Sequence, residues 1–292
     1  MPGDCHIHMI LDGVYYRAAI DHQRARLDEA LIRARLADYR AAGVDFLRDG
    51  GDAWGVGAFA ARVAPECGVD YRTPGFPIHR RGRYGGFIGR AFDDMKSYAA
   101  LVAEAKASGA DFIKIMVSGL MDFSRLGEIT SQPLEFAEMR EMTRIAHAEG
   151  FCVMAHANGA DTIKAALDAG VDSIEHGAYP DAEALRMLAQ SGAVWVPTLV
   201  TIGNLIGEGR YPDDVLRPLL EGQMAAARDC AAQGGKIAAG SDAGAYRVPH
   251  VQGLRDERAL LHRALGADAA RILDAGEAEI RRKFKLGGAD AR

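Results

Sequence analysis

The sequence of 292 residues lacks several features that would place it in common classes of protein. No stretch approaches the roughly 20 consecutive apolar residues that a membrane-spanning helix requires. No basic segment followed by an apolar one indicates a secretion signal at the N-terminus. The 35 lysines and arginines are balanced by 40 aspartates and glutamates, for a formal net charge of −5, with no charged tail. This composition argues against nucleic acid or a membrane as a partner.

Cysteine is also scarce and widely spaced. The four cysteines, Cys5, Cys67, Cys152 and Cys230, form no Cys-x-x-Cys pair. Such spacing favours small buried apolar side chains in a reducing compartment over a disulfide framework or a thiolate zinc site. We therefore expect a cytoplasmic protein.

What the sequence does contain is a regular alternation of short apolar runs and longer amphipathic segments. Eight runs are predicted strands, at residues 5–10, 44–49, 69–74, 111–117, 151–156, 172–176, 193–198 and 236–242. Five of the intervening segments end in a glycine just before the next strand, at Gly43, Gly109, Gly150, Gly170 and Gly192. Glycine is the expected residue just past a helix end. Alternating strands and helices predict parallel strands with right-handed crossovers, and eight units predict an α/β fold of the (β/α)8 TIM barrel type. A doubly wound open sheet is the alternative.

The chain shows no Pro/Ser-rich linker that would divide it. We expect one barrel domain over residues 1–292, with a C-terminal helix and tail from about residue 268 to 292. The longest irregular stretch, residues 73–90, follows the third predicted strand and is interpreted as an active-site loop.

Candidate catalytic residues fall at the ends of several predicted strands. In "DCHIH", His6 and His8 would point to the same side of a strand, because side chains alternate along it. Later strands add four more polar residues, namely Lys114, His156, His176 and Asp242. Barrel enzymes carry their catalytic groups at the carboxyl ends of the strands. These residue types bind or bridge metal ions, so the pattern predicts a metal site at that end. We call these six residues the six candidate ligands.

Lys114 is the most informative of the six candidate ligands. In "DFIKIMV", Ile113 and Ile115 suit the helix-covered side of the strand, so Phe112 and Lys114 should face the barrel interior. An inward, unpaired ammonium is penalised by desolvation. An internal ion pair, for example with Asp242, is one explanation. The other is a neutral amine that takes up carbon dioxide, giving a carbamate able to bridge two cations.

Seven segments of the sequence together resemble the amidohydrolase superfamily, in particular its imidazolonepropionase-like and metal-dependent dipeptidase branch. They are "PGDCHIH", "VDFLRDGG", "DFIKIMVSG", "AHANG", "AGVDSIEHG", "VPTL" and "GSDAG", in the family's order and over nearly the whole chain. The resemblance implies a binuclear centre of two divalent metal ions, most often zinc, with manganese, iron or cobalt as alternatives. His6, His8 and Asp242 would bind one metal. His156 and His176 would bind the other, with carboxylated Lys114 as the bridge.

The same resemblance implies a hydrolase that cleaves an amide or peptide C–N bond of a small substrate, with a dipeptide or N-acyl amino acid favoured. Asp242 would take a proton from a water shared by the metals and pass it to the leaving amine. The alternatives are a deaminase, a cyclic-amide or lactone hydrolase of the same superfamily, or a non-catalytic binding barrel. Deaminases of the superfamily place a glutamate just after the fifth-strand histidine, and "AHANGADTI" offers none. Most relatives also carry a flanking β-sandwich, which is largely missing here.

Four further residues are predicted substrate contacts because they follow strand ends: Arg48, His79, Tyr84 and His250. Arg48 is alternatively an internal salt-bridge partner at the barrel mouth, together with Asp49, or a bidentate partner of a substrate carboxylate. Glu175 is expected to alternate outward from its strand. His262 and the other helical histidines are assigned no ligand role. Association into a homo-oligomer is left open.

Overall fold

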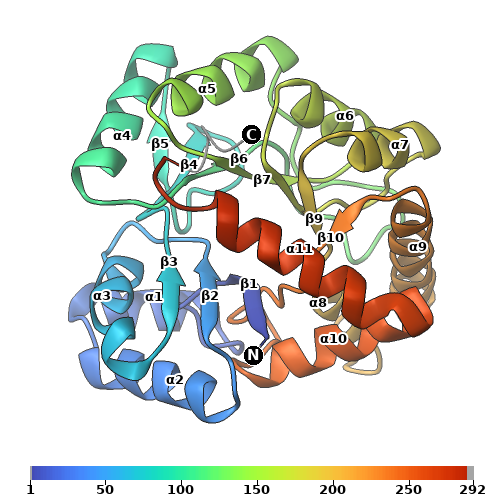
Figure 1. Ribbon diagram of the computed structural model, residues 1–292, viewed down its shortest axis with the longest axis horizontal. Coiled ribbons are helices and arrows are strands. Elements are labelled where there is room, and N and C mark those ends of the chain that lie inside the picture. Colours follow the sequence, from blue (N-terminus) through green and yellow to red (C-terminus); the bar gives the residue numbers. More distant parts are fainter. Residues whose placement is uncertain (1, 288–292) are drawn as a thin grey trace.

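Ten short strands form two parallel sheets in a computed structural model that describes residues 2–287 (Figure 1). The first sheet has the order β1-β2-β3, with β1 (Gly3–Ile7), β2 (Phe46–Asp49) and β3 (Asp70–Arg72). The second has the order β10-β9-β8-β7-β6-β4-β5. Its strands are β4 (Pro77–Arg80), β5 (Arg90–Phe92), β6 (Ile113–Met116), β7 (Val153–Ala157), β8 (Ser173–His176), β9 (Val194–Val196) and β10 (Lys236–Ile237).

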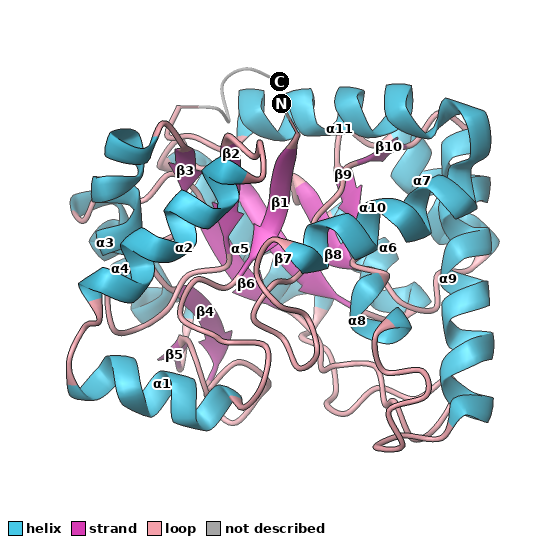
Figure 2. Ribbon diagram, turned by 90° about the horizontal axis from the view of Figure 1, so that it is seen from below, coloured by secondary structure: helices cyan, strands magenta, loops and turns pink. Residues whose placement is uncertain are grey.

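Backbone hydrogen bonds link the two sheets at both sides of the first. The segment after β10 runs beside β1, where the Cys5 amide donates to the Ala239 carbonyl at 2.9 Å and the Asp242 amide to the His6 carbonyl at 2.7 Å. On the other side, the Asp111 amide, just before β6, donates to the carbonyl of Thr73, just after β3, at 2.9 Å. The arrangement is a TIM-barrel-like α/β fold of parallel strands surrounded by helices (Figure 2).

The helices alternate with the strands as the sequence predicts. They are α1 (Tyr16–Ala25), α2 (Glu29–Ala41), α3 (Val56–Val63), α4 (Met95–Ala107), α5 (Phe136–Ala148), α6 (Ala160–Asp168), α7 (Ala182–Gln190), α8 (Val200–Gly203), α9 (Asp213–Ala232), α10 (Gln252–Leu265) and α11 (Ala269–Lys283). The glycines after α2, α4, α5 and α6 have φ between 78° and 87°, which a side chain would strain. The glycine after α7 does not follow this pattern, because that helix ends at Ser191 in extended backbone. Among the helices of residues 2–287, none has the length and apolar character needed to cross a membrane.

An inner apolar core fills the space between the strands at their amino ends. It consists of Cys5, Phe46, Phe112, Cys152, Met154, Val194, Val196, Ala238, Ile280 and Phe284. The helix α11 lies across this end of the strands (Figure 1) and supplies Ile280, while Phe284 follows directly after the helix. Its approach is close, since a Cβ on Gly276 would lie 2.0 Å from the Ile237 carbonyl oxygen. The Gly3 amide, at the start of β1, donates to Glu277 Oε2 at 2.7 Å. The amino end of the strands is therefore covered, and a site can form only at the opposite end.

The structure corrects one prediction about the architecture. Residues 73–90 are not a continuous loop, because they contain β4 and the first residue of β5. The strand β4 pairs with β5 and β6, but its four residues begin with a proline and are too short to show an alternating pattern. Every strand of residues 2–287 belongs to one of the two sheets, so no separate sandwich accompanies them. The predicted tail extends to residues 288–292, which lie outside the described residues.

Candidate metal centre

The six candidate ligands lie on the strands or on the segments that follow them. His6 is on β1 and His8 follows it. Lys114 is on β6, while His156 and His176 are on β7 and β8. Asp242 lies on the segment that is hydrogen-bonded to β1. Strands distant in sequence thus bring the six residues to one end of the fold.

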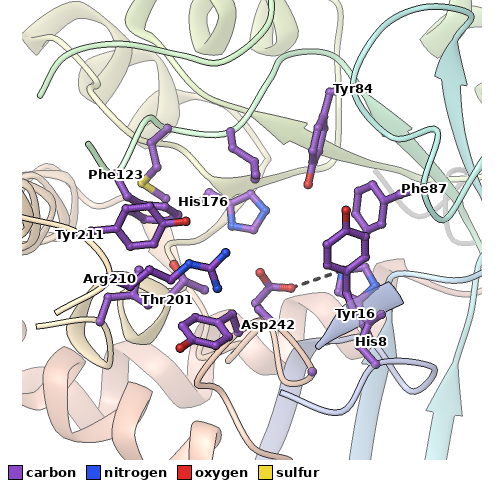
Figure 3. A pocket seen from close by; sticks show the side chains of 17 residues that line it. His8, Tyr16, Tyr84, Phe87, Phe123, His176, Thr201, Arg210, Tyr211 and Asp242 are labelled. Carbon is purple, nitrogen blue, oxygen red and sulfur yellow. Dashed lines mark ion pairs between the residues drawn. The ribbon is translucent and has the colours of Figure 1, made fainter. Parts of the chain in front are cut away.

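Ring and carboxylate contacts show that the histidines and Asp242 form one cluster. The centroid of the His6 ring lies 5.4 Å from that of His8 and 5.2 Å from that of His176. The His156 and His176 centroids are 4.6 Å apart. Asp242 Oδ1 lies 3.3 Å from His8 Nε2 (dashed in Figure 3) and 3.7 Å from His6 Nε2. One ligand atom from each of His6, His8 and Asp242 can lie within 4.8 Å of the others.

Three of the four imidazoles have one ring nitrogen close to a buried polar group. His6 Nδ1 lies 2.9 Å from Glu175 Oε2, and His176 Nδ1 lies 2.7 Å from Thr198 Oγ1. His156 Nε2 donates to the Gly119 carbonyl oxygen at 3.0 Å. Such contacts fix the tautomer and orientation of a metal-binding histidine. They leave His6 Nε2, His176 Nε2 and His156 Nδ1 as the ring nitrogens available to a metal.

Glu175 is part of a buried network that the sequence did not predict. Arg48 Nη2 donates to Glu175 Oε1 at 2.8 Å and to Oε2 at 3.0 Å, and both side chains are 0% exposed. Arg48 Nη1 also donates to Ser173 Oγ at 2.9 Å. The expectation that Glu175 points outward was wrong. His176 has φ 64°, and this left-handed backbone ends the alternation of β8, so that Glu175 and His176 both face the interior.

Burial keeps the imidazoles of His6, His156 and His176 neutral. Desolvation lowers the pKa of His156 to about 3, with the charge of Lys114 adding to the effect. The same two causes hold the pKa of His6 well below its ordinary range, and for His176 desolvation combines with its neighbouring histidines. Neutral imidazole is the form that binds metals.

The pKa values of Lys114 and Asp242 are shifted in directions that suit a metal site. Desolvation lowers the pKa of Lys114 to about 8, and no hydrogen-bond partner for its Nζ occurs in residues 2–287. A sizeable fraction of the amine is therefore neutral near pH 7 to 8. Burial raises the pKa of Asp242, but the hydrogen bond from His8 and the electrostatic interactions with His6, His8 and Lys114 outweigh burial and lower it. Asp242 is thus an ionised carboxylate.

A cavity of about 300 Å³ opens above the cluster, with His8, His176 and Asp242 on its inner side (Figure 3). The rest of the lining is mainly aromatic or aliphatic, and it includes Tyr16, Tyr84, Phe87, Phe123, Tyr211 and Tyr246. Tyr84 packs its ring 4.8 Å from that of His156, and its hydroxyl points into the cavity. A mostly apolar pocket with a few convergent polar groups is typical of a small-molecule site.

Of the four predicted substrate contacts, only Tyr84 lines this cavity. The geometry gives Arg48 the alternative role of an internal salt-bridge partner, although with Glu175 and not with Asp49. His250 bonds Tyr39 Oη at 3.1 Å and the Leu11 carbonyl at 2.9 Å, so both of its nitrogens are used within the fold.

His79 is also placed away from the cavity. It lies under the turn after β4, where a Cβ on Gly85 would be 2.8 Å from the His79 Cβ. Its Nδ1 contacts the Arg80 carbonyl at 3.0 Å. The positions of Arg48, His79 and His250 thus argue against direct substrate contact. Their place near a strand end could not predict this, because it does not determine which way a side chain points.

Sequence reasoning missed several residues of the site. Thr198, which holds His176, was recognisable as the last residue of the seventh predicted strand. Gly119, whose carbonyl holds His156, follows the Lys114 strand. Arg210 and Tyr211 lie between α8 and α9, where no motif signals a role, and only the position after a barrel strand could have indicated them.

The comparisons with known proteins agree with this geometry. A family model described as "Amidohydrolase family" matches residues 36–278. The chain belongs to the amidohydrolase family. Members of the family generally bind divalent metals, and the chain is accordingly a hydrolase.

Several relatives are similar over most of this amidohydrolase. An uncharacterized protein of Mycobacterium tuberculosis is 29% identical over 318 aligned residues, which cover 100% of this chain and 76% of the relative. The crystal structure of a Xaa-Pro dipeptidase with bound methionine matches with a TM-score of 0.74 at 23% identity, over 99% of this chain and 77% of that one. The crystal structure of Aspergillus niger ochratoxinase matches with a TM-score of 0.74 at 21% identity, over 96% and 70%. At these identities the structural matches support the fold alone.

Proposed function

We propose that this amidohydrolase cleaves an amide or peptide C–N bond of a small substrate, using two divalent metal ions held by the six candidate ligands. Zinc is the first candidate, and a dipeptide or N-acyl amino acid is the first candidate substrate. The observation that carries the proposal is a buried, unpartnered Lys114 amine beside imidazoles that are already oriented by Glu175, Thr198 and Gly119.

The donor set fits a metal pair. His6, His8 and Asp242 are close enough to share one ion, and imidazole with carboxylate oxygen suits zinc. His156 and His176 offer two nitrogens for a second ion. The Lys114 amine, with its lowered pKa and missing partner, is suited to become a carbamate that joins the two. Metal ions bound there would polarise the substrate carbonyl and lower the pKa of the attacking water.

The side chains of this protein would perform the proton transfers. Asp242 is an ionised carboxylate at the inner side of the cavity, so it can accept a proton from the attacking water and pass it to the leaving amine nitrogen. Burial raises the pKa of Tyr84, so its hydroxyl stays protonated and can donate a hydrogen bond to the substrate. Membership of the amidohydrolase family supports hydrolysis as the reaction.

The proposal extends to the architecture. Hydrogen bonds join the two sheets on both sides, which supports a closed eight-stranded barrel. In this barrel β3 and β4 act as one interrupted strand, and β5, which among the strands of residues 2–287 pairs only with β4, is not counted. With the barrel closed in this way, residues 1–292 form a single barrel domain.

The test is release of amine from a library of dipeptides and N-acyl amino acids by protein purified without chelator and loaded with zinc, with metal content measured in parallel. We expect about two metal ions per chain and release from at least one substrate class. The His156→Asn variant should lose both the second metal and activity. The matched control is His262→Asn, which changes an exposed histidine of α10 and should behave as the parent protein. A metal-free protein, or a dimetal protein inactive on every amide, would contradict the proposal.

A further inference from the structure

One cationic side chain in the cavity has no role in the metal centre. Arg210 lies in residues 204–212, which connect α8 to α9, and its guanidinium extends into the cavity that Asp242 and His176 also line (Figure 3). Among the described lining residues it is the sole lysine or arginine. Its position separates it from the six candidate ligands, which all come from strand ends.

Arg210 differs from neighbouring arginines in having no carboxylate partner. Arg217 donates to Asp213 Oδ2 at 2.8 Å, and Arg247 is paired with Glu208. For Arg210, no ion pair exists with any acidic group of residues 2–287. An arginine directed into a pocket without a counter-charge is available to an anionic ligand.

The Arg210 guanidinium lies over the rings of two tyrosines. Its Cζ is 4.3 Å from the centroid of the Tyr246 ring and 5.4 Å from that of Tyr211. A cation–π contact uses the face of the ring and consumes no N–H group of the arginine. Those N–H groups match the two oxygens of a carboxylate in a bidentate geometry. The contacts with the rings also limit the freedom of the arginine before a ligand binds, which favours affinity.

The surroundings of Arg210 determine what the rest of the ligand should be. Phe123 packs against Tyr211 at 5.4 Å between ring centroids, and Met121 and Leu205 line the same cavity. An apolar wall beside one cation fits a ligand that carries a carboxylate next to a large apolar group.

We propose that Arg210 is a specificity-determining residue that binds the free α-carboxylate of the leaving amino acid, whose side chain is aromatic or large and aliphatic. The inference rests on the proposed function. It narrows the substrates to N-acyl amino acids and dipeptides with a free carboxyl terminus, and it excludes their C-terminal amides. The scissile carbonyl of such a substrate would face the inner side of the cavity, where Asp242 lies.

The experiment compares binding and catalysis in the metal-loaded protein. Binding is measured by calorimetry with 3-phenylpropanoate and with its amide, 3-phenylpropanamide, which differ only in the carboxylate. Catalysis is measured as acetate release from N-acetylphenylalanine and from N-acetylphenylalanine amide. The variants are Arg210→Gln, Arg210→Lys and the control Arg217→Gln, which alters an exposed ion-paired arginine of α9.

We expect the parent protein and Arg217→Gln to bind the carboxylate roughly 10- to 100-fold more tightly than the amide, the range for a charge-assisted hydrogen-bonded pair. Arg210→Gln should lose this preference and raise KM for N-acetylphenylalanine by a similar factor, with kcat changed far less. Arg210→Lys should keep only part of the preference for the carboxylate, because a lysine keeps the charge but not the paired donors. Equal binding of the two probes to the parent protein, or an unchanged preference in Arg210→Gln, would overturn the assignment. A carboxylate preference without any acetate release would support the anion site and contradict the hydrolase proposal.

Discussion

The buried pair of Arg48 and Glu175 provides a quantitative test of how the site is held. Both side chains are fully buried and share two hydrogen bonds of 2.8 and 3.0 Å. The variant Glu175→Gln keeps the volume but leaves the Arg48 guanidinium without a counter-charge. Removing one partner of a buried ion pair costs about 3–5 kcal/mol. We expect a loss of that size in the free energy of unfolding, which is a large share of the roughly 5–15 kcal/mol typical of a folded protein.

Glu175→Gln should also weaken metal binding, because Glu175 contacts His6. Glu175 Oε2 lies 2.9 Å from His6 Nδ1, and loss of an orienting contact of this kind typically weakens metal binding by about 10- to 100-fold. The assay has two parts. Urea unfolding in the presence of EDTA reports the ion pair alone, and competition with a zinc-binding dye reports metal affinity.

A double-mutant cycle isolates the coupling. Arg48→Met should cost about as much as Glu175→Gln, because each leaves one buried charge. The double variant should cost clearly less than the sum, with a coupling of about 3 kcal/mol. The control Glu183→Gln alters an exposed glutamate of α7 paired with Arg186 and should change stability by less than about 0.5 kcal/mol. The coupling would be refuted if the losses of unfolding free energy were additive in the double variant, or if either single variant lost less than about 1 kcal/mol.

Three further predictions address the lysine, a buried acid and the last helix. Lys114→Ala should reduce bound metal from about two ions per chain to one and abolish hydrolysis, as measured by elemental analysis and amine release; full activity would contradict the bridging role. Burial raises the pKa of Glu257 from 4.5 to about 8, so the folded state binds the proton of this carboxyl more tightly than the unfolded state does. The free energy of unfolding should therefore fall, by up to roughly 4–5 kcal/mol, as the pH rises from about 4.5 through 8. Glu257→Gln should flatten that part of the profile in urea unfolding, and an unchanged slope would exclude Glu257 as its source. Gly276→Ala should destabilise the protein by about 1–3 kcal/mol, because the new Cβ would meet the Ile237 carbonyl. The control Gly222→Ala on α9 should not destabilise it, because the space around Gly222 is open. Equal unfolding midpoints for the two alanine variants would contradict this packing.

The sequence predicted those parts of the molecule that depend on periodicity and composition. Alternating runs gave the parallel strands and their helices, and the inward position of Phe112 and Lys114 followed from strand alternation alone. The strand β4 was not predictable in this way, because its four residues carry too little pattern. Glu175 was misplaced because the alternation rule fails where the backbone turns left-handed, as at His176.

Substrate-side residues were harder to predict for a different reason. Arg48 and His79 lie within β2 and β4, and His250 follows the Asp242 segment. Their side chains are used by internal hydrogen bonds that no local pattern encodes. Arg210 enters the cavity from an irregular connection whose path depends on tertiary packing. The polar residues of strand ends can therefore be predicted from sequence, whereas the walls of the cavity require the fold.

The covering of the amino end of the strands by α11 has a consequence for biosynthesis. The inner core joins Cys5 and Phe46 to Ile280 and Phe284, which come far later in the sequence. A nascent chain on the ribosome cannot complete that core until the segment that follows the last strand has been translated and has emerged. Until then the apolar ends of the strands stay open, so chaperones that shield unfinished sheets should bind the protein during synthesis.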